Sequence, residues 1–143
     1  MYQKIVIVGN LGNDPEMRYL PDGTAVTSFN VATNQKWTDR ASGQPREETT
    51  WFRVSVWRNQ AESANQYLSK GRKVLVEGRI KPDPQTGHPR TYVRNDGSVG
   101  ASFEITADVI RFLGGREDAG YISEGQGDYE AGDAAQEEDD IPF

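Results

Sequence analysis

The chain of 143 residues contains no cysteine and only one histidine, His88. Without cysteine, the protein can have neither a disulfide framework nor a thiolate metal site. A single histidine excludes sites that need two histidine ligands and argues against a His-based catalytic triad. No apolar run approaches the roughly 20 residues of a membrane-spanning helix. Met1 precedes a strand-like segment and not a signal peptide, so we expect a soluble, cytoplasmic protein.

Charge divides the chain into two unlike parts. Residues 1–113 hold 15 Lys and Arg against 12 Asp and Glu, which gives +3, whereas residues 114–143 hold one Arg against ten acids, which gives −9. The second part also contains six glycines and few large apolar side chains, so we expect a disordered tail. A mildly basic body with an acidic tail is typical of a protein that binds a polyanion and carries an interaction tail.

The tail ends in a segment, here called the tip, that combines acids with apolar groups: Asp139-Asp140-Ile141-Pro142-Phe143. It is too short and too charged to form a core, but it suits a peptide ligand. The Ile and Phe side chains would fill apolar pockets, the proline would limit the conformers lost on binding, and the carboxylates would meet basic residues of a partner. The alternative is an acidic end that only solvates the protein. We favour the ligand because a solvating end has no need to finish on Phe.

Alternation of apolar and polar residues predicts that residues 1–113 fold mostly as strands. Five segments show a strand pattern, namely residues 5–8, 26–34, 51–57, 73–80 and 102–111. One helix is expected between the third and fourth, with Asn59 as its cap, Glu62 at the capping-box position and Gly71 as its stop. Residues 81–89 form a proline-rich connection that cannot lie inside a strand. This order predicts an all-β fold, a five-stranded Greek-key barrel of the OB type.

The segment 51–57 has two faces of different chemistry. One face is apolar and belongs to the core, whereas the other presents Trp51, Arg53, Ser55 and Trp57. Flat rings spaced along a strand stack on unpaired bases, at about 1–3 kcal/mol per base and with little sequence preference. The arginine can pair with phosphate. The alternative for this face is a subunit interface or contact with another element of the chain.

Aromatic and basic residues occur together in two further segments. A polar hairpin contains Trp37, Arg40 and Arg46, and the segment Arg90-Thr91-Tyr92-Val93-Arg94 places an aromatic ring between two cations. This recurrence favours binding of single-stranded nucleic acid over core packing. Trp37 shares the strand parity of the apolar residues before it, so it would point toward the core unless the strand twists first.

No residues for catalysis or metal binding are assembled in the sequence. Gly9-Asn10-Leu11-Gly12 follows a strand but completes neither a dinucleotide fingerprint nor a phosphate loop, so its glycines are expected to be turn residues. Several aspartates lie beside turns, where their side chains serve the backbone. We therefore expect no enzymatic activity, no metal and no cofactor.

Several motifs follow one another in a specific order: residues 8–19, Trp37, residues 51–54, residues 67–71, residues 76–78 and finally the tip. In this order they resemble the bacterial single-stranded DNA-binding proteins of the homotetrameric OB-fold family, over most of residues 3–113. The resemblance implies that the bases stack on Trp37, Trp51, Trp57 and Tyr92. It implies phosphate contacts by Arg40, Arg46, Arg53, Lys70 and Arg90.

The resemblance also implies two domains and several partners. Residues 1–113 would form the OB-fold domain that binds single-stranded DNA and assembles a homotetramer. Residues 114–143 would carry the tip that recruits replication, recombination and repair proteins, at the nucleoid. Two functions of other classes stay open, an RNA-binding OB module and an adaptor whose aromatic face binds a protein. The tip speaks against the first, and quenching of tryptophan fluorescence by oligo-dT would eliminate the second.

Overall fold

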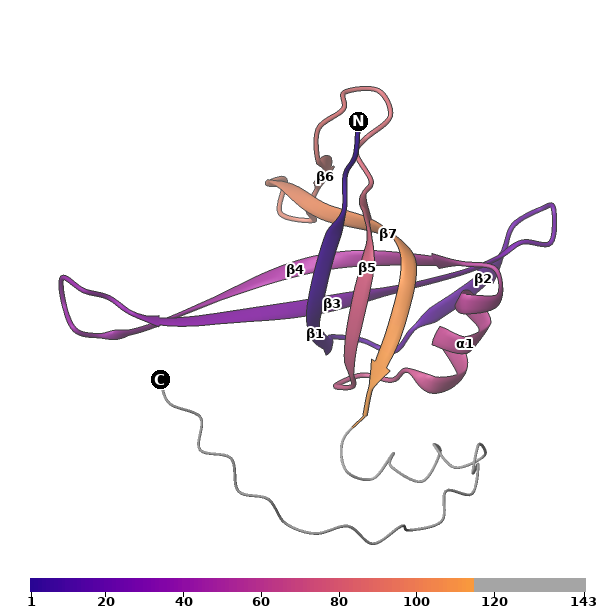
Figure 1. Ribbon diagram of the computed structural model, residues 1–143. Helices are drawn as coiled ribbons and strands as arrows, with labels where there is room; N and C mark the ends of the chain where they lie inside the picture. The colour runs from indigo at the N-terminus through magenta and orange to yellow at the C-terminus, as the bar shows by residue number, and fades with distance from the viewer. Residues whose placement is uncertain (115–143) are drawn as a thin grey trace, which may run out of the picture.

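Seven strands and one helix form in residues 1–114, the part of the chain that the computed structural model describes (Figure 1). The expectations for residues 115–143, the tip included, lie outside the described residues. The elements are β1 (Ile5–Leu11), β2 (Glu16–Tyr19), β3 (Ala25–Thr38), β4 (Pro45–Trp57), α1 (Asn59–Tyr67), β5 (Lys73–Ile80), β6 (Arg90–Val93) and β7 (Val99–Leu113). At nine residues, α1 is too short to cross a membrane, and nothing else in residues 1–114 forms a helix that could.

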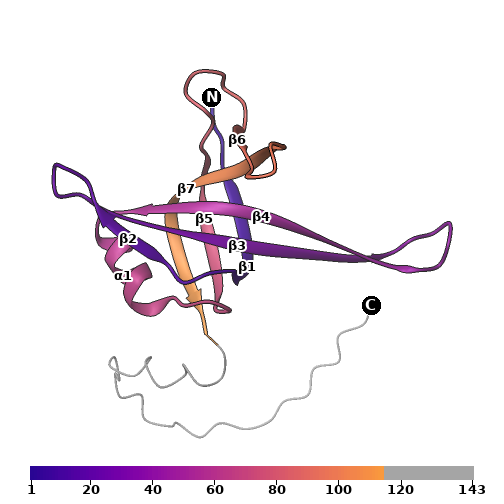
Figure 2. The same cartoon turned by 180° about the vertical axis from the view of Figure 1, so that it is seen from behind.

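Five of the strands close into a barrel, seen from opposite sides in Figures 1 and 2. The strands are hydrogen-bonded in the order β1-β5-β7-β4-β3, and pairing of β1 with β3 closes the ring. The β4–β7 pair is parallel and the other pairs of the ring are antiparallel. Helix α1 lies between β4 and β5, the third and fourth barrel strands along the chain. The predicted five-stranded OB-type barrel with one helix in this position is confirmed.

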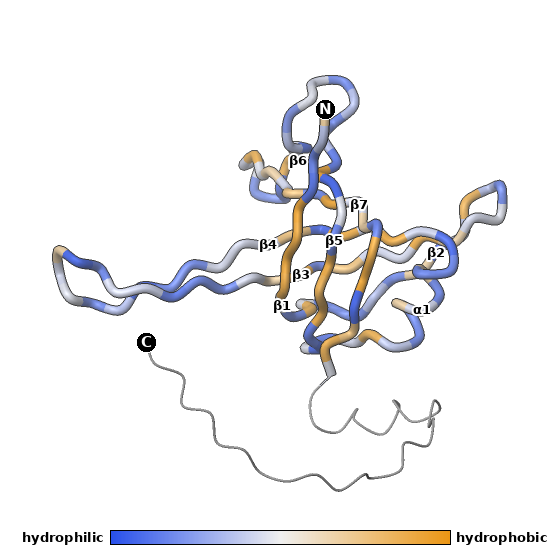
Figure 3. Tube along the Cα trace, viewed as in Figure 1, coloured by the Kyte–Doolittle hydropathy of each residue, from blue (hydrophilic) through white to orange (hydrophobic). Residues whose placement is uncertain are grey.

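The barrel interior is filled by the alternating apolar residues of its strands. The largest fully buried apolar side chains are Phe29, Ile105, Val26, Val31, Val54, Val56, Val74 and Val76. Full burial of such a side chain stabilises the fold by about 1.5–3 kcal/mol. Helix α1 is tied to the barrel by Thr27, whose buried hydroxyl donates a hydrogen bond of 2.6 Å to the Ala61 carbonyl. Figure 3 shows hydrophobic residues along the barrel strands.

The ends of α1 differ from the prediction. Asn59 is the first helical residue and not the cap; the capping position belongs to Arg58, whose φ is +61° and whose side chain makes no capping hydrogen bond. The backbone N–H of Arg58 still donates a hydrogen bond to the Ala25 carbonyl. The pairing of β4 with β3 therefore extends to Arg58, and the helix can begin only at the next residue. The helix ends at Tyr67 because Leu68 is extended, and Gly71 belongs to the turn before β5.

Two short strands were not predicted, and four of the five predicted strands, all but β5, are longer than expected. Strand β2 pairs with β3, and β6 pairs with β7. Strands β3 and β4 continue beyond the barrel as a two-stranded hairpin, here called the arm (residues 34–50), which projects from the body (Figures 1 and 2). As predicted, residues 81–89 contain no strand.

Candidate nucleic-acid interface

The outer face of β4 carries the residues that alternation placed there. Val54 and Val56 are fully buried, whereas Trp51 is 52% and Trp57 37% exposed, and Arg53 between them is exposed. Strand β4 pairs with β3 along its whole length and with β7 at residues 52–55, so the backbone around Arg53 is held from both sides. The structure therefore presents two tryptophans and one arginine from a rigid strand.

The ring of Trp51 lies against a glycine from another part of the chain. A Cβ atom on Gly12 would lie 2.4 Å from Cζ3 of Trp51, closer than any side chain could be accommodated without movement. The Gly12 N–H donates a hydrogen bond of 2.9 Å to the Asn30 carbonyl, which fixes this segment to β3. Gly12 lies in a bend after β1, as expected, and its lack of a side chain also lets the ring approach the backbone. The expectation was wrong for Gly9, which lies within β1, where a Cβ atom would lie 2.2 Å from the Ala32 carbonyl oxygen.

Lys70 lies beside the same segment. Its backbone N–H donates 2.8 Å to the Asp14 carboxylate, and the next N–H, of Gly71, donates 2.8 Å to the Leu11 carbonyl. The turn between α1 and β5 is thus docked on the segment that contacts Trp51. Lys70 is exposed on this docked turn.

Trp37 lies on the arm and does not point into the core. It is 48% exposed and stands directly opposite Arg46 in the β3–β4 ladder. The core ends before this point, because every residue of β3 from Asn34 onward is exposed. A shallow depression surrounds the ring, lined by Lys36, Trp37, Thr38, Pro45, Arg46 and Glu47.

Strand parity alone would separate Trp37 from Trp51. Trp51 pairs with Ala32, and Trp37 lies five residues farther along β3, which corresponds to the opposite side of a flat ribbon. The arm is not flat, since its two strands cross before they reach the closing turn of the hairpin (Figures 1 and 2). Two-stranded ribbons twist more strongly than strands inside a wide sheet. In a twisted arm, flat parity therefore does not decide which side Trp37 faces.

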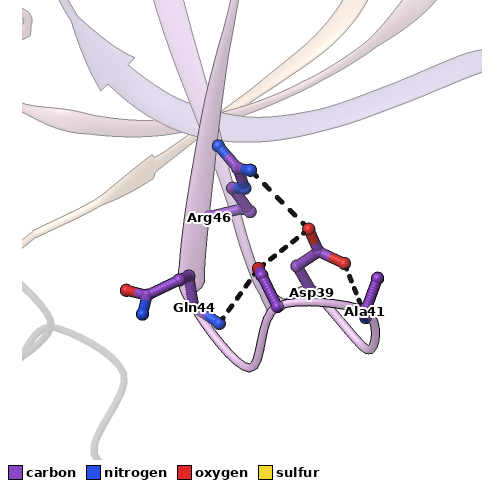
Figure 4. A network of polar contacts seen from close by, with 5 residues as sticks. Asp39, Ala41, Gln44 and Arg46 are labelled. Atoms are coloured by element: carbon purple, nitrogen blue, oxygen red, sulfur yellow. Dashed lines mark hydrogen bonds and ion pairs between the residues drawn. The ribbon is translucent and has the colours of Figure 1, made fainter.

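Asp39 organises the turn that closes the arm (Figure 4). One carboxylate oxygen accepts 2.9 Å from the Ala41 N–H, and the other accepts 3.1 Å from the Ser42 hydroxyl and lies 3.6 Å from Nη2 of Arg46. The hydrogen bond from Ala41, and then that from Ser42, lowers the pKa of Asp39 below its ordinary value of 3.8. Arg40 is exposed in this turn.

The β6–β7 hairpin presents the third aromatic and basic group. Tyr92 is 48% exposed and lies over Gly100, its partner in the ladder, where a Cβ atom would lie 2.7 Å from Cζ of the ring. The guanidinium carbon of Arg94 is 5.7 Å from the centre of the Tyr92 ring. Arg90 is exposed on the same side of β6 as Tyr92. Arg94, which the sequence interpretation did not include among the site residues, supports this ring.

The structure thus gathers the candidate residues into three exposed groups. Trp51, Arg53 and Trp57 lie on β4; Trp37, Arg40 and Arg46 lie on the arm; Arg90 and Tyr92 lie on β6. Lys70 lies apart from these groups in sequence, on the turn before β5. Within residues 1–114, no three His, Asp or Glu side chains are placed to hold a metal ion. Exposed rings with neighbouring cations can hold a flexible chain that offers flat bases and phosphates.

The chain was compared with protein families and curated proteins. A model described as "Single-strand binding protein family" matches residues 2–113. The single-stranded DNA-binding proteins of Neisseria meningitidis serogroups A and B are each 43% identical to this chain over 115 residues. That region covers 80% of this chain and 62% of each relative, so the chain spans less than two thirds of their length.

Solved structures show the same likeness. A Plasmodium falciparum SSB in complex with ssDNA is similar with a TM-score of 0.65 and 29% identity, over 80% of this chain and 97% of that one. A deletion mutant of the single-stranded DNA binding protein from Thermus aquaticus is similar with a TM-score of 0.61 and 30% identity, over 81% of this chain and 52% of that one. The family match spans all five barrel strands, and therefore the chain belongs to the single-strand binding protein family.

Proposed function

We propose that this protein binds single-stranded DNA with little sequence preference, by base stacking and phosphate contacts. The observation that carries the proposal is the outer face of β4, where Trp51 and Trp57 stand half-exposed on either side of Arg53. Large exposed aromatic surfaces are rare unless something binds them. The likeness to an SSB that was solved with ssDNA supports the same ligand.

In this proposal the stacking residues are Trp37, Trp51, Trp57 and Tyr92. The phosphate contacts come from Arg40, Arg46, Arg53, Lys70 and Arg90. All nine are exposed, and they lie on the barrel, on the arm and on the β6–β7 hairpin, which suits a ligand that follows a path across the surface. The protein acts by holding the strand and catalyses no reaction.

We also propose that the protein assembles as a homotetramer through the outer face of β1, β5 and β7. Val6 and Val8 on β1 are 53% and 48% exposed and lie beside Glu77 and Leu75 in the ladder. Within the described chain, residues 5–8 pair with β5 on one side only, so the other edge of β1 is free. An apolar face next to a free strand edge is a surface that a second copy can cover.

The wider role follows from binding. A protein that holds single strands would keep them out of hairpins and protect them during replication, recombination and repair, at the bacterial nucleoid. The acidic tip would recruit the enzymes of these processes. An acidic tail can only compete with DNA for a basic face, so removal of the tip should leave DNA affinity intact or raise it.

The test is a titration of intrinsic tryptophan fluorescence with oligo-dT at two salt concentrations, for the wild type, Trp51→Ala and Tyr67→Ala. Tyr67 is a matched control because it is exposed but packs against Phe112, on the helix side of the barrel. We expect quenching by DNA in the wild type, a loss of about 1–3 kcal/mol in Trp51→Ala and no change in the control. Absence of quenching and of binding by the wild type would refute the proposal. Tighter binding of an equal-length RNA would indicate an RNA-binding module.

A further inference from the structure

The arm is electrically neutral, in contrast to the basic body that carries it. Between residues 34 and 50 the cations Lys36, Arg40 and Arg46 are matched by Asp39, Glu47 and Glu48. Two of the three cations are paired within the arm, Lys36 Nζ with Glu47 Oε1 at 3.9 Å and Arg46 Nη2 with Asp39 Oδ2 at 3.6 Å. The arm therefore offers little net charge to a polyanion, and its contribution must depend on where its side chains are held.

Asp39 is the residue that holds the turn and the Arg46 side chain of the arm in place (Figure 4). Its side chain accepts from Ala41 and Ser42, its N–H donates 2.9 Å to the Gln44 carbonyl, and its own carbonyl accepts 2.8 Å from the Gly43 N–H. Ser42 in turn accepts 3.4 Å from the Gln44 N–H. These contacts close the turn in one form. The same carboxylate then reaches across the hairpin to the Arg46 guanidinium.

Arg46 is the direct partner of Trp37 in the ladder, so whatever fixes Arg46 also fixes the surroundings of this ring. The Arg46 side chain is 58% exposed and can exchange one anionic partner for another. A long arginine side chain loses many conformers when it is immobilised, and a side chain that is already held loses fewer on binding. A phosphate beside a base stacked on Trp37 would meet a guanidinium that is already in place.

We propose that Asp39 is a positioning residue for DNA binding by the arm. It closes the turn and keeps the Arg46 guanidinium beside Trp37, so that ring and cation meet a base and its phosphate together. On binding, the phosphate takes over the guanidinium from the Asp39 carboxylate. The inference rests on the proposed binding of single-stranded DNA and adds a role for an acidic residue in it.

A simpler role for Asp39 predicts the opposite result. If its negative charge only repelled DNA, removal of the charge would tighten binding, and a glutamate would behave like the aspartate. If Asp39 positions the arm, both Asp39→Ala and Asp39→Glu weaken binding. The glutamate keeps the charge, but its longer side chain cannot hold Ala41, Ser42 and Arg46 in the same geometry.

The experiment compares oligo-dT affinity of the wild type, Asp39→Ala, Asp39→Glu and the control Asp22→Ala. Asp22 holds another turn in the same way, accepting 3.0 Å from the Thr24 N–H, but that turn joins β2 to β3 and lies outside the arm. We expect both Asp39 variants to bind about two- to fivefold more weakly, as for the loss of one ordered side chain, and Asp22→Ala to bind like the wild type. Unchanged or tighter binding by either Asp39 variant overturns the proposal, as does equal weakening by Asp22→Ala.

A second measurement separates positioning from a general loss of structure. In an Arg46→Ala background, Asp39→Ala should change affinity by less than about twofold, because the side chain that it positions is gone. A full, additive loss in that background overturns the proposal. The wild type serves as the reference for function: if it fails to bind oligo-dT, the proposed function fails and not the positioning role alone.

Discussion

The barrel and the arm share strands β3 and β4, but they hold their side chains by different means. In the barrel, Phe29 and Val54 pack in the interior and are almost fully buried. In the arm, all residues from Asn34 to Thr38 are exposed, and the ribbon is held by its own ladder and by the turn at Asp39. Core packing fixes Trp51 and its neighbours, whereas local polar contacts fix Trp37 and Arg46.

This difference has a consequence for binding. An aromatic ring on the barrel is carried by a rigid strand, so it can gain nearly the full free energy of stacking on a nucleobase. A ring on a two-stranded ribbon has little tertiary support, and isolated two-stranded hairpins are marginally stable. We therefore expect the barrel aromatics to give most of the affinity, and the arm to extend the path of the strand.

The largest expected effect separates the two regions by stability. Phe29→Ala removes a buried ring from the barrel and should lower the free energy of unfolding by about 3–5 kcal/mol. Trp37→Ala removes a larger ring from the arm and should change it by less than about 0.5 kcal/mol, because no core surrounds Trp37. Urea unfolding followed by circular dichroism measures both. Comparable losses in the two variants would show that the arm is packed as the barrel is.

The sequence predicted the barrel better than the arm. Alternation assigned Trp51, Arg53 and Trp57 correctly to the outer face, because in a barrel the pleat alone decides which side is buried. It failed for Trp37, since the sequence does not show where the core ends and the ribbon begins to twist. Strand β2 was missed because it has only four residues, all of them at least partly exposed, which is too short a segment for its alternation to stand out.

Contacts between distant segments account for the remaining differences. The start of α1 is set by the hydrogen bond between Arg58 and Ala25, and no local capping pattern reports on that pairing. Gly12 and Gly100 accommodate Trp51 and Tyr92, but a glycine in a sequence does not show which ring will lie on it. The barrel, its helix position and most candidate residues were accessible from patterns, whereas the supports of the rings were not.

A change of intermediate size tests the support of Trp51. Gly12→Ala would place a methyl group where the ring now lies, so the ring must shift or the segment must move. We expect a loss of about 1–3 kcal/mol in stability, as for other overpacked sites, and about fivefold weaker binding to oligo-dT. In a Trp51→Ala background the same glycine change should leave DNA affinity unaltered. Weakening that persists there would mean that Gly12 acts independently of the ring.

The smallest expected effect is a pH dependence confined to the arm. The pKa of Asp39 is lowered below 3.8 by its hydrogen bonds from Ala41 and Ser42, so the folded turn favours the carboxylate. A lowered folded pKa means that this contribution is complete above the unfolded value of 3.8 and is lost as the pH falls through the folded value. Amide hydrogen exchange of Ala41 and Gly43 should therefore speed up, relative to unstructured peptides, as the pH falls below about 4, while barrel amides such as that of Val54 stay protected. Asp39→Asn should abolish the dependence, because its amide can still accept from Ala41 but does not titrate in this range, and a transition that survives in this variant would assign the effect to another group.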